Sequence, residues 1–459
     1  MQSDSTMGDA VLNRMRKPEF REYLASLLME ICAIDTSPRS EPTEWGRREA
    51  SCFAILEREL SALGLPGARL ERRPVNPEIE NHKNFSLLHF TKTPKRPQGL
   101  SAAETYAGRT NLVLVVPGSN DSSEGQNTAV NGHIDVVAPY FPPRREGDVI
   151  HGRGACDDKG GVIAFVGAMK ALAEELKLRG LRFNKNVVGM MVIEEETGGN
   201  GSLSLALDRD LKKLYDTILI LECTENKVHP ANRGAVWYQC NLALPGVPLF
   251  EMAAFVYEEL EREGRAIKAE SAHALFPQRP VQTCHGIIGD VGQHPSRICG
   301  EVSFSIALPG GAISGKAEAL VRDCLEFALE EYIGRYGDKT KAIDPRTGKP
   351  KVDHHYDLRA EGGRLIVDVH GSTGHMGAIL ENDGAITKMA QFVRALVCSK
   401  ARLEALAGGR IAIELLNREE DGNLRLEGGQ GFVPTHSLEQ VMDRMARAAE
   451  RGAEAYLRR

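Results

Sequence analysis

The chain has 459 residues, of which 42% are hydrophobic and 26% are charged, and its formal net charge at pH 7 is -6. This composition is ordinary for a folded globular protein, and the length predicts two or three domains. The mildly acidic charge balance gives no electrostatic basis for binding nucleic acid or an anionic membrane surface.

The nine cysteines are scattered and odd in number, and the sequence has no C-x-x-C pair. This usage predicts free thiols in a reducing compartment. The first segment, MQSDSTMGDAVLNRMRKPEF, contains no apolar signal-peptide core, and no window has the ~20 apolar residues of a membrane span. We therefore expect a cytoplasmic protein without a membrane partner.

The first half of the chain is predicted to form an α/β domain. Apolar periodicity predicts amphipathic helices over residues 19–34 and 43–63. Strands rich in valine and isoleucine, with a helix over 161–176 among them, are predicted at 111–116, 128–132, 186–193 and 216–222. Nearly continuous apolar strands that alternate with helices predict a sheet buried on both faces.

The pattern changes from about residue 235 onward. The predicted strands are 235–244, 281–289, 301–307 and 364–370, and the predicted helices are 248–263, 316–334 and 384–398. Residues 337–363 form a polar loop, in which His354 and His355 are expected to be solvated. A last helix is predicted over 437–458, where Ser437 and Gln440 fit a capping box.

The stretch VNGHIDVVAPY, residues 130–140, ends a predicted strand with two polar side chains. His133 and Asp135 face the same side of a strand, because residues two apart do so. A metal-bound imidazole commonly donates its other ring N–H to a carboxylate, so this pair fits half of a metal site. The alternative is a solvated histidine beside an aspartate in a turn.

Four further motifs carry polar side chains that could hold a metal. HGRGACDDKGG contains the adjacent Asp157 and Asp158, and VIEEETGGNGS contains three glutamates at 194–196. Glu222 ends a predicted strand, and His436 precedes the last helix. Taken separately, each motif also has a structural explanation. The two aspartates could form an acidic loop that caps a helix, and the three glutamates could lie in a solvated loop. Glu222 could be an exposed carboxylate, and His436 a surface or core histidine near a helix end.

The positions of these motifs, taken together, favour a metal site. Each polar residue lies at the C-terminal end of a predicted strand or in the loop just after it, which is where open α/β sheets bind ligands. Histidine nitrogens and carboxylate oxygens suit zinc and related divalent ions. The sequence therefore predicts a metal site at this edge of the sheet.

The order H-x-D, G-R-G-x-x-D-D-K-G-G, E-E-x-G, a lone glutamate and a C-terminal histidine resembles the di-zinc metallopeptidase family of acetylornithine deacetylase, succinyl-diaminopimelate desuccinylase, carboxypeptidase G and carnosine dipeptidase. The resemblance covers residues 20–235 and the C-terminal helix. It implies a three-layer α/β catalytic domain with a mixed sheet, made of residues 1–235 and 408–459. It also implies an inserted α+β, ferredoxin-like lid at 236–407, through which the chain forms a homodimer.

The resemblance also implies a role for each matching residue. His133 binds the first zinc ion and is oriented by Asp135. Asp157 bridges both zinc ions, and Glu222 completes the first site. Glu196 and His436 hold the second ion, and Glu195 is the general base. The metals are two Zn²⁺, with Co²⁺ or Mn²⁺ as alternatives, and the Asp157–Asp158 peptide bond is cis.

The sequence departs from the family in its second half. The strand VWYQCNLAL runs into PGVPLF without the expected lid histidine, whereas HGSTGHMGAIL, much later, resembles the missing segment. His375 is then the oxyanion-stabilising candidate, with a lid-core or turn histidine as the alternative, and the lid segments stand in a rearranged order. Arg297, in GQHPSRICGE, could bind a substrate carboxylate bidentately or lie on the lid surface.

The segment GGAISGKA, residues 310–317, is one residue from a phosphate-binding loop. Ala317 replaces the hydroxyl that such a loop needs for magnesium, so a turn is favoured over a nucleotide site. The prediction is a metal-dependent hydrolase of a small N-acyl amino acid or short peptide. A dipeptidase or aminopeptidase, and a non-catalytic binding protein with the same fold, are the alternatives.

Overall fold

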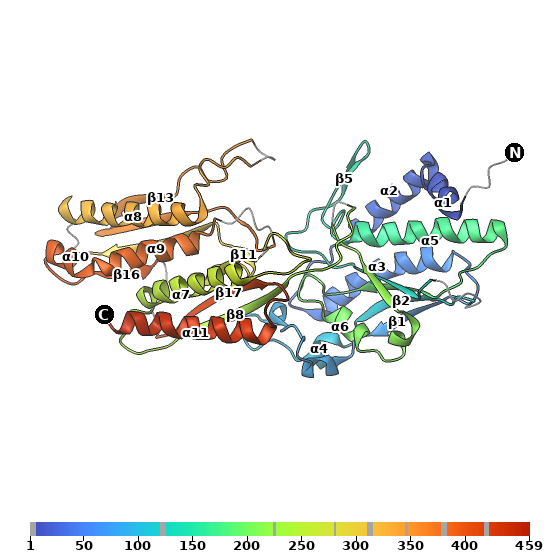
Figure 1. Cartoon of the computed structure of the whole chain (residues 1–459), viewed down its shortest axis with the longest axis horizontal. Helices are drawn as coiled ribbons and strands as arrows, with labels where there is room; N and C mark the ends of the chain where they lie inside the picture. Colours follow the sequence, from blue (N-terminus) through green and yellow to red (C-terminus); the bar gives the residue numbers. More distant parts are fainter. Residues whose placement is uncertain are drawn as a thin grey trace. The chain divides into compact units, whose positions relative to one another are not determined.

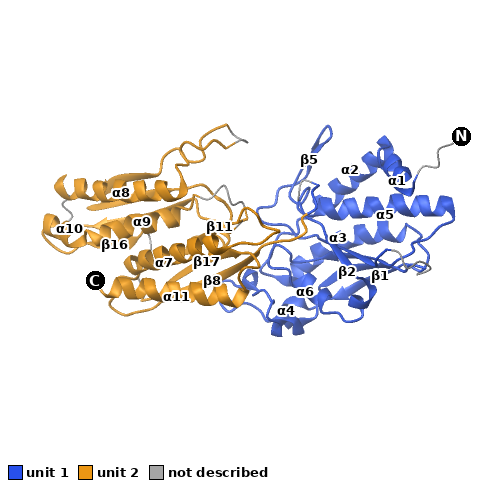
Figure 2. Cartoon of the chain, in the orientation of Figure 1, with its two compact units in different colours: residues 1–228 blue, residues 229–459 orange. Residues whose placement is uncertain are grey.

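The computed structural model describes residues 6–119, 125–223, 226–279, 281–309, 315–344, 348–377, 383–416 and 422–459. The chain folds into two compact units, unit 1 (Met1–Val228) and unit 2 (His229–Arg459), which are coloured separately in Figure 2. None of the described helices combines the length and the apolar character needed to cross a membrane.

Unit 1 is a mixed α/β domain (Figure 1). Its main sheet has the strand order β1-β2-β6-β3-β7, in which β1, β2 and β6 pair antiparallel and β6, β3 and β7 pair parallel. The strands of this sheet are β1 (Arg69–Pro74), β2 (Thr110–Val116), β3 (Thr128–His133), β6 (Val187–Val192) and β7 (Thr217–Ile220), and a separate hairpin joins β4 (Arg144–Glu146) to β5 (Val149–His151). The helices are α1 (Met7–Met15), α2 (Pro18–Cys32), α3 (Pro42–Ser61), α4 (Ala102–Tyr106), α5 (Lys159–Arg179) and α6 (Asn200–Ala206).

The central strands of this sheet are buried on both faces, as the sequence predicts. In β2, Leu112 and Leu114 pack in the cluster that contains side chains of α2, α3 and α5. Val113 and Val115 point the other way and pack with Leu205 of α6. The edge strand β7 differs, because Ile218, Leu219 and Ile220 are exposed, so the expected burial on both faces does not extend to this edge.

Unit 2 contains two four-stranded antiparallel sheets among its described strands, with the orders β10-β9-β17-β8 and β13-β14-β12-β16. The strands are β8 (Gly234–Leu242), β9 (Thr283–Ile288), β10 (Val291–Gly292), β11 (Arg297–Ile298), β12 (Glu301–Ala307), β13 (Tyr356–Glu361), β14 (Arg364–His370), β15 (Gly374–His375), β16 (Ala412–Leu415) and β17 (Leu424–Phe432). The helices are α7 (Leu249–Glu270), α8 (Gly315–Tyr336), α9 (Ala385–Cys398), α10 (Lys400–Ala407) and α11 (Leu438–Leu457).

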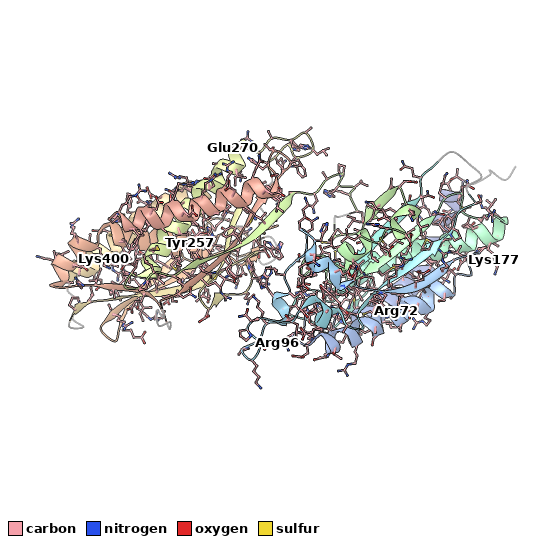
Figure 3. The ribbon with its side chains drawn as sticks, turned by 90° about the horizontal axis from the view of Figure 1, so that it is seen from below. Arg72, Arg96, Lys177, Tyr257, Glu270 and Lys400 are labelled. Atoms are coloured by element: carbon pink, nitrogen blue, oxygen red, sulfur yellow. The ribbon has the colours of Figure 1, made fainter. Side chains whose placement is uncertain are left out.

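One apolar core joins the sheets and helices of unit 2. Tyr257 of α7, labelled in Figure 3, is buried in it, as are Phe304 of β12 and Phe392 of α9. The capping box expected at the start of α11 is confirmed, since the Ser437 hydroxyl accepts the main-chain N–H of Gln440 and the Gln440 side chain accepts that of Ser437.

The compact units divide the chain differently from the division expected from the sequence. The resemblance implies that residues 408–459 join the catalytic domain, whereas they lie in unit 2 of the structure. The physical reason is main-chain pairing and helix packing, because β17 forms ladders with β8 and β9 and α11 packs along α7. Residues 310–314 of the GGAISGKA segment lie outside the described residues, and α8 begins directly after them.

Candidate metal centre

Three of the predicted ligands come together at the carboxyl ends of the parallel strands in unit 1. His133 is the last residue of β3, Glu222 follows β7, and Asp157 lies just before α5. One ligand atom of each lies within 4.8 Å of the others. The strand ends place the first two side by side, because β3 and β7 are parallel neighbours in the sheet.

The imidazole of His133 is buried and held from two sides. Its Nε2 lies 3.1 Å from Asp157 Oδ1 and 3.8 Å from Glu195 Oε2. Its Nδ1 lies 3.0 Å from the main-chain carbonyl oxygen of Asp135 and 3.4 Å from the Asp135 carboxylate. Without a metal, Nε2 donates to the Asp157 carboxylate. With a metal bound, Nδ1 would keep its hydrogen toward Asp135 and Nε2 would face the ion with its lone pair.

Asp135 has a second role that the sequence did not indicate. Its two carboxylate oxygens accept the main-chain N–H groups of Glu195 and Glu196, each at 3.0 Å. The carboxylate is fully buried, so it fixes the turn after β6 that carries both glutamates. The side chain of Glu195 is about half exposed, at 45%, which leaves it open to a substrate.

The acidic groups around His133 repel one another in this site. Partial removal from water, together with the neighbouring carboxylates, raises the pKa of Glu195 to about 7 and that of Glu196 to about 8. Burial likewise raises the pKa of Asp158 to about 7 and raises that of Glu222. The hydrogen bond from His133 instead lowers the pKa of Asp157.

These residues fit a bound divalent cation. A cation offsets the mutual repulsion of the carboxylates, and the donor set of one imidazole and several carboxylate oxygens is one that zinc accepts. The peptide bond between Asp157 and Asp158 is cis, as the resemblance implies.

The third glutamate of the triplet, Glu194, points away from this cluster and into the core. It has a positive φ of 63°, and its carboxylate pairs with the Arg109 guanidinium and accepts a hydrogen bond of 2.8 Å from the Tyr106 hydroxyl. Arg109 also binds Glu49 of α3 through two nitrogens, at 2.6 and 3.0 Å. The sequence pattern gave no signal for this network, since Arg109 and Glu49 are distant along the chain.

The Lys159 side chain supports the loop that carries Asp157. It is buried, and its amine donates to the carbonyl oxygens of Ile31 and Ile34 at 3.2 and 2.6 Å. This ties the start of α5 to the end of α2 and fixes the loop that carries Asp157. Its position directly after the two aspartates was the available signal.

The other predicted site residues belong to unit 2. His436 lies between β17 and α11, where its Nε2 is 2.9 Å from the carboxylate of Glu270, labelled in Figure 3, and 3.3 Å from Arg444 Nη1. Its Nδ1 is buried without a hydrogen-bond partner among the described residues.

Arg297 and His375 are directly opposite each other in the antiparallel β11–β15 ladder. The main-chain N–H of Gly377 donates to His375 Nδ1 at 3.0 Å, so the neutral ring carries its hydrogen on Nε2. Arg297 and Lys351 line a pocket of about 660 Å³ within unit 2. Arg297 and His375, which come from separate sequence motifs, are thus neighbours in the fold.

Comparison with known proteins identifies the family. Residues 129–456, well over half of the chain, match the family described as Peptidase family M20/M25/M40. The chain belongs to this family. The resemblance inferred from the motifs is therefore confirmed.

Individual relatives align over different shares of this M20 chain. Succinyl-diaminopimelate desuccinylase of Acidovorax ebreus is 25% identical over 331 residues, which are 62% of this chain and 72% of the relative. A Peptidase M20 domain-containing protein of Schizosaccharomyces pombe is 34% identical over 113 residues, which are 25% of this chain and 27% of the relative. The chain thus spans about a quarter of the length of the yeast protein.

Among solved structures, human carnosine dipeptidase 1 has a TM-score of 0.46 at 14% identity, over 98% of this chain and 78% of that one. M20 enzymes are metal-dependent, so the expectation of a metal cofactor agrees with the family.

Proposed function

We propose that this chain hydrolyses an amide bond in a small N-acyl amino acid or a short peptide. The observation that carries the proposal is the cluster of His133, Asp157 and Glu222, with the Glu195 carboxylate 3.8 Å from the same imidazole nitrogen. The cluster supports the proposal because one strand edge then carries residue types that can hold a metal, with a carboxylate beside them that can move a proton.

In this proposal His133, Asp157 and Glu222 hold the metal, and Glu196 and His436 complete a site for a second ion, with two Zn²⁺ as the metals and Co²⁺ or Mn²⁺ as substitutes. A divalent cation bound there polarises a carbonyl group and lowers the pKa of a bound water toward ~7. The positions of Glu196 and His436 as ligands are carried over from the family.

Glu195 is the proposed general base and acid. Its carboxylate would accept a proton from water and deliver it to the leaving nitrogen. In the metal-free chain burial and the neighbouring carboxylates raise the pKa of Glu195 to about 7, and a bound cation would favour the ionised form that acts as the base. Asp135 keeps this carboxylate in place through the main-chain N–H of Glu195. Glu195 is proposed neither as a nucleophile nor as a metal ligand. Replacing its carboxylate by an amide should therefore remove proton transfer and leave the metal ligands unchanged.

The pairing of Arg297 with His375 supports substrates that carry a carboxylate. A guanidinium recognises a carboxylate through two parallel hydrogen bonds, and a His375 Nε2–H is a suitable donor to an oxygen that becomes negative. We therefore propose Arg297 as a carboxylate-binding residue and His375 as the oxyanion-stabilising residue. The lid role of this part of the chain, and a homodimer formed through it, belong to the same proposal.

The test is hydrolysis of N-acetyl and N-succinyl amino acids and of dipeptides by the zinc-loaded chain, before and after treatment with a chelator. Glu195→Gln should keep its metal content and lose at least about a hundredfold in kcat, because general acid–base catalysis contributes ~10²–10⁴-fold. Glu80→Gln, which changes an exposed glutamate of unit 1, is the control and should retain full activity. Chelator-resistant hydrolysis, or near-normal kcat for Glu195→Gln, would overturn the proposal.

A further inference from the structure

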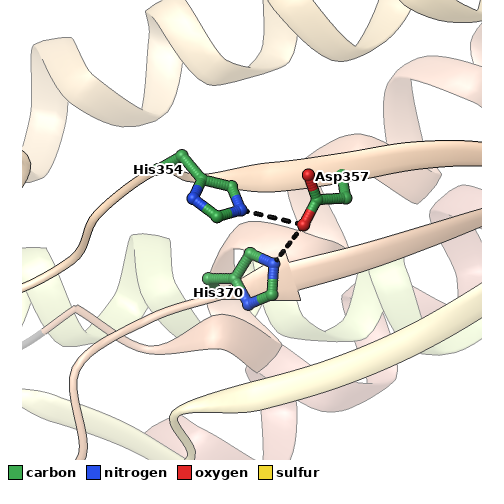
Figure 4. Close-up of side chains that lie close together, drawn as sticks. All are labelled: His354, Asp357 and His370. Atoms are coloured by element: carbon green, nitrogen blue, oxygen red, sulfur yellow. Dashed lines mark hydrogen bonds and ion pairs between the residues drawn. The ribbon is translucent and has the colours of Figure 1, made fainter.

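A second group of metal-type ligands lies in unit 2, separate in the chain from the residues of the candidate metal centre. His354 Nε2 is 2.8 Å from Asp357 Oδ2, and His370 Nε2 is 3.0 Å from the same oxygen (Figure 4). The two imidazole rings are 4.6 Å apart between centroids. One ligand atom of each of the three residues lies within 4.8 Å of the others.

The β13–β14 hairpin brings these residues together through its register. Asp357 is opposite Asp368, and His370 lies two residues beyond, so Asp357 and His370 are diagonal neighbours on one face. Tyr356 and Val369, the adjacent opposite pair, face the other way, since Val369 is buried and the Tyr356 ring packs on Phe392. Asp357 and His370 therefore lie on the face of the sheet turned away from the core. His354, two residues before β13, approaches the same Asp357 oxygen from the preceding segment.

The backbone at this point is held by buried contacts. The main-chain N–H of His370 donates to the carbonyl oxygen of His355 at 2.9 Å. The side chain of His355 is buried, in contrast to the solvated residue that the polar loop predicts, and lies 3.1 Å from Asp338 and 3.0 Å from the Lys388 amine. These contacts hold the backbone next to His354, at the start of β13.

The spacing of the donor atoms suits a four-coordinate ion. A tetrahedral zinc ion bound at about 2.0–2.1 Å sets its donor atoms roughly 3.3 Å apart. The two nitrogen–oxygen separations of 2.8 and 3.0 Å would widen by a few tenths of an ångström, and the ligand atoms of the two histidines already lie within 4.8 Å of each other. His354 and Asp357 are exposed and His370 is half-buried, so an ion can enter directly from solvent.

We propose that His354, Asp357 and His370 bind a divalent transition-metal ion of the zinc class, with water in the remaining position. Two imidazole nitrogens and one carboxylate oxygen are the donors that such ions prefer over magnesium or calcium. The ion links the start of β13 to the end of β14, the strand that leads to His375 in β15. This site is distinct from the proposed catalytic metals and does not depend on them.

The test measures zinc binding in a protein whose candidate metal centre in unit 1 has been disabled, so that only other zinc sites contribute. Full-length protein with His133→Ala and Asp157→Ala is stripped with a chelator, and zinc is titrated against a chromophoric competitor. Addition of His354→Ala and His370→Ala to this background should remove about one zinc ion per chain. His229→Ala, which changes an exposed histidine of unit 2, is the matched control and should leave the zinc content unchanged.

A milder variant guards against misfolding. Asp357→Asn keeps the size of the side chain and one acceptor oxygen but removes the charge, and it should weaken zinc binding in the background protein by about tenfold or more. Circular dichroism should be unchanged. Equal zinc stoichiometry and affinity in all of these proteins, or no zinc bound by the background protein, would overturn the proposal.

Discussion

At the scale of single residues, the Asp135 carboxylate holds the turn that carries Glu195 and Glu196, the proposed general base and the proposed metal ligand. It accepts one main-chain N–H from Glu195 and one from Glu196, and its own main-chain carbonyl contacts the His133 ring. One buried aspartate thereby fixes both the imidazole and the glutamate turn. The sequence pattern H-x-D predicts that the Asp135 carboxylate orients the imidazole. In the structure the nearer contact of Nδ1 is the main-chain carbonyl oxygen at 3.0 Å, with the carboxylate at 3.4 Å.

We predict that Asp135→Asn lowers kcat by about tenfold to a hundredfold. The amide has one oxygen, so its NH₂ group must face one of the two main-chain N–H groups, and an unsatisfied buried donor costs about 1–3 kcal/mol. Steady-state kinetics and metal content of the purified variant check this, with a fall in kcat expected at little changed KM. Asp148→Asn, at an exposed aspartate, is the control. An unchanged kcat would show that the turn does not need both oxygens.

At the scale of elements, Arg109 connects α3, the start of β2 and the turn after β6, which carries residues of the candidate metal centre. It precedes β2, binds Glu49 of α3, and binds Glu194 directly after β6. The three side chains are at most 2% exposed. The turn that presents Glu195 and Glu196 is therefore anchored in the core by an ion network.

Replacing Arg109 should destabilise unit 1 strongly. Arg109→Met leaves two buried carboxylates without a counter-charge, which we expect to reduce the free energy of unfolding by about 3–5 kcal/mol. Arg109→Lys keeps the charge but cannot bind Glu49 through two nitrogens, so a smaller loss is expected. Urea unfolding of the three proteins measures both. If the methionine variant lost less stability than the lysine variant, the network would not be the anchor we describe.

Helix α11 is joined to α7 by ion pairs that depend on pH. Arg444 Nε and Arg451 Nη2 bind Glu263 at 2.6 and 2.7 Å. Burial opposes ionisation of Glu263, but the hydrogen bonds from the two arginines outweigh it and lower its pKa. A carboxyl group whose pKa is lowered by folding contributes stability above its ordinary pKa and loses that contribution as pH falls through the folded value.

Glu263→Gln should therefore weaken α11 at neutral pH and have little effect in acid. We expect amide hydrogen exchange in α11 to be about two- to fivefold faster than in the wild-type chain at pH 7, since a partly exposed pair contributes modestly. The ratio of the two rates, measured by mass spectrometry at each pH, should approach unity below the folded pKa of Glu263. Glu450→Gln, at an exposed glutamate on α11, provides the comparison. A ratio of exchange rates that grows as the pH falls would contradict the conclusion that folding lowers the pKa of Glu263.

The elements that the sequence predicted are those whose signal is local. The strands β2, β3 and β6 are continuous apolar runs, so they were found within one or two residues of their ends. The strand β17 was missed because glycines interrupt its apolar pattern. Those glycines reflect neighbours distant in sequence, since a Cβ on Gly428 would lie 2.4 Å from the Cys284 carbonyl oxygen and one on Gly429 2.9 Å from Met376 Sδ.

The two candidate metal sites also differ in whether local sequence signals predict them. His133, Asp157 and Glu222 follow strands or precede a helix, so their convergence follows from the rule that parallel strands end at one edge. The cluster of His354 and His370 depends on the register of a hairpin whose first strand, β13, consists mainly of exposed and charged residues. A strand of that composition has no apolar alternation to reveal it.

At the scale of the whole molecule, each unit has its own core. The clusters of buried apolar side chains among the described residues each lie within one unit, with Leu56 of α3 in unit 1 and Leu396 of α9 in unit 2. Both side chains are fully buried. Units of this size are large enough to fold as separate domains, and a protein of this kind need not unfold in a single step.

We predict that a core substitution lowers the thermal transition of its own unit and leaves the other in place. Leu56→Ala and Leu396→Ala each remove a buried side chain, which should cost about 2–5 kcal/mol and lower one transition by several degrees. Differential scanning calorimetry of the wild type and both variants, with Leu178→Ala at a side chain that is 72% exposed as the control, gives the shifts. Different transitions should move in the two core variants. If both variants shifted one common transition by the same amount, the two cores would unfold as a single cooperative unit.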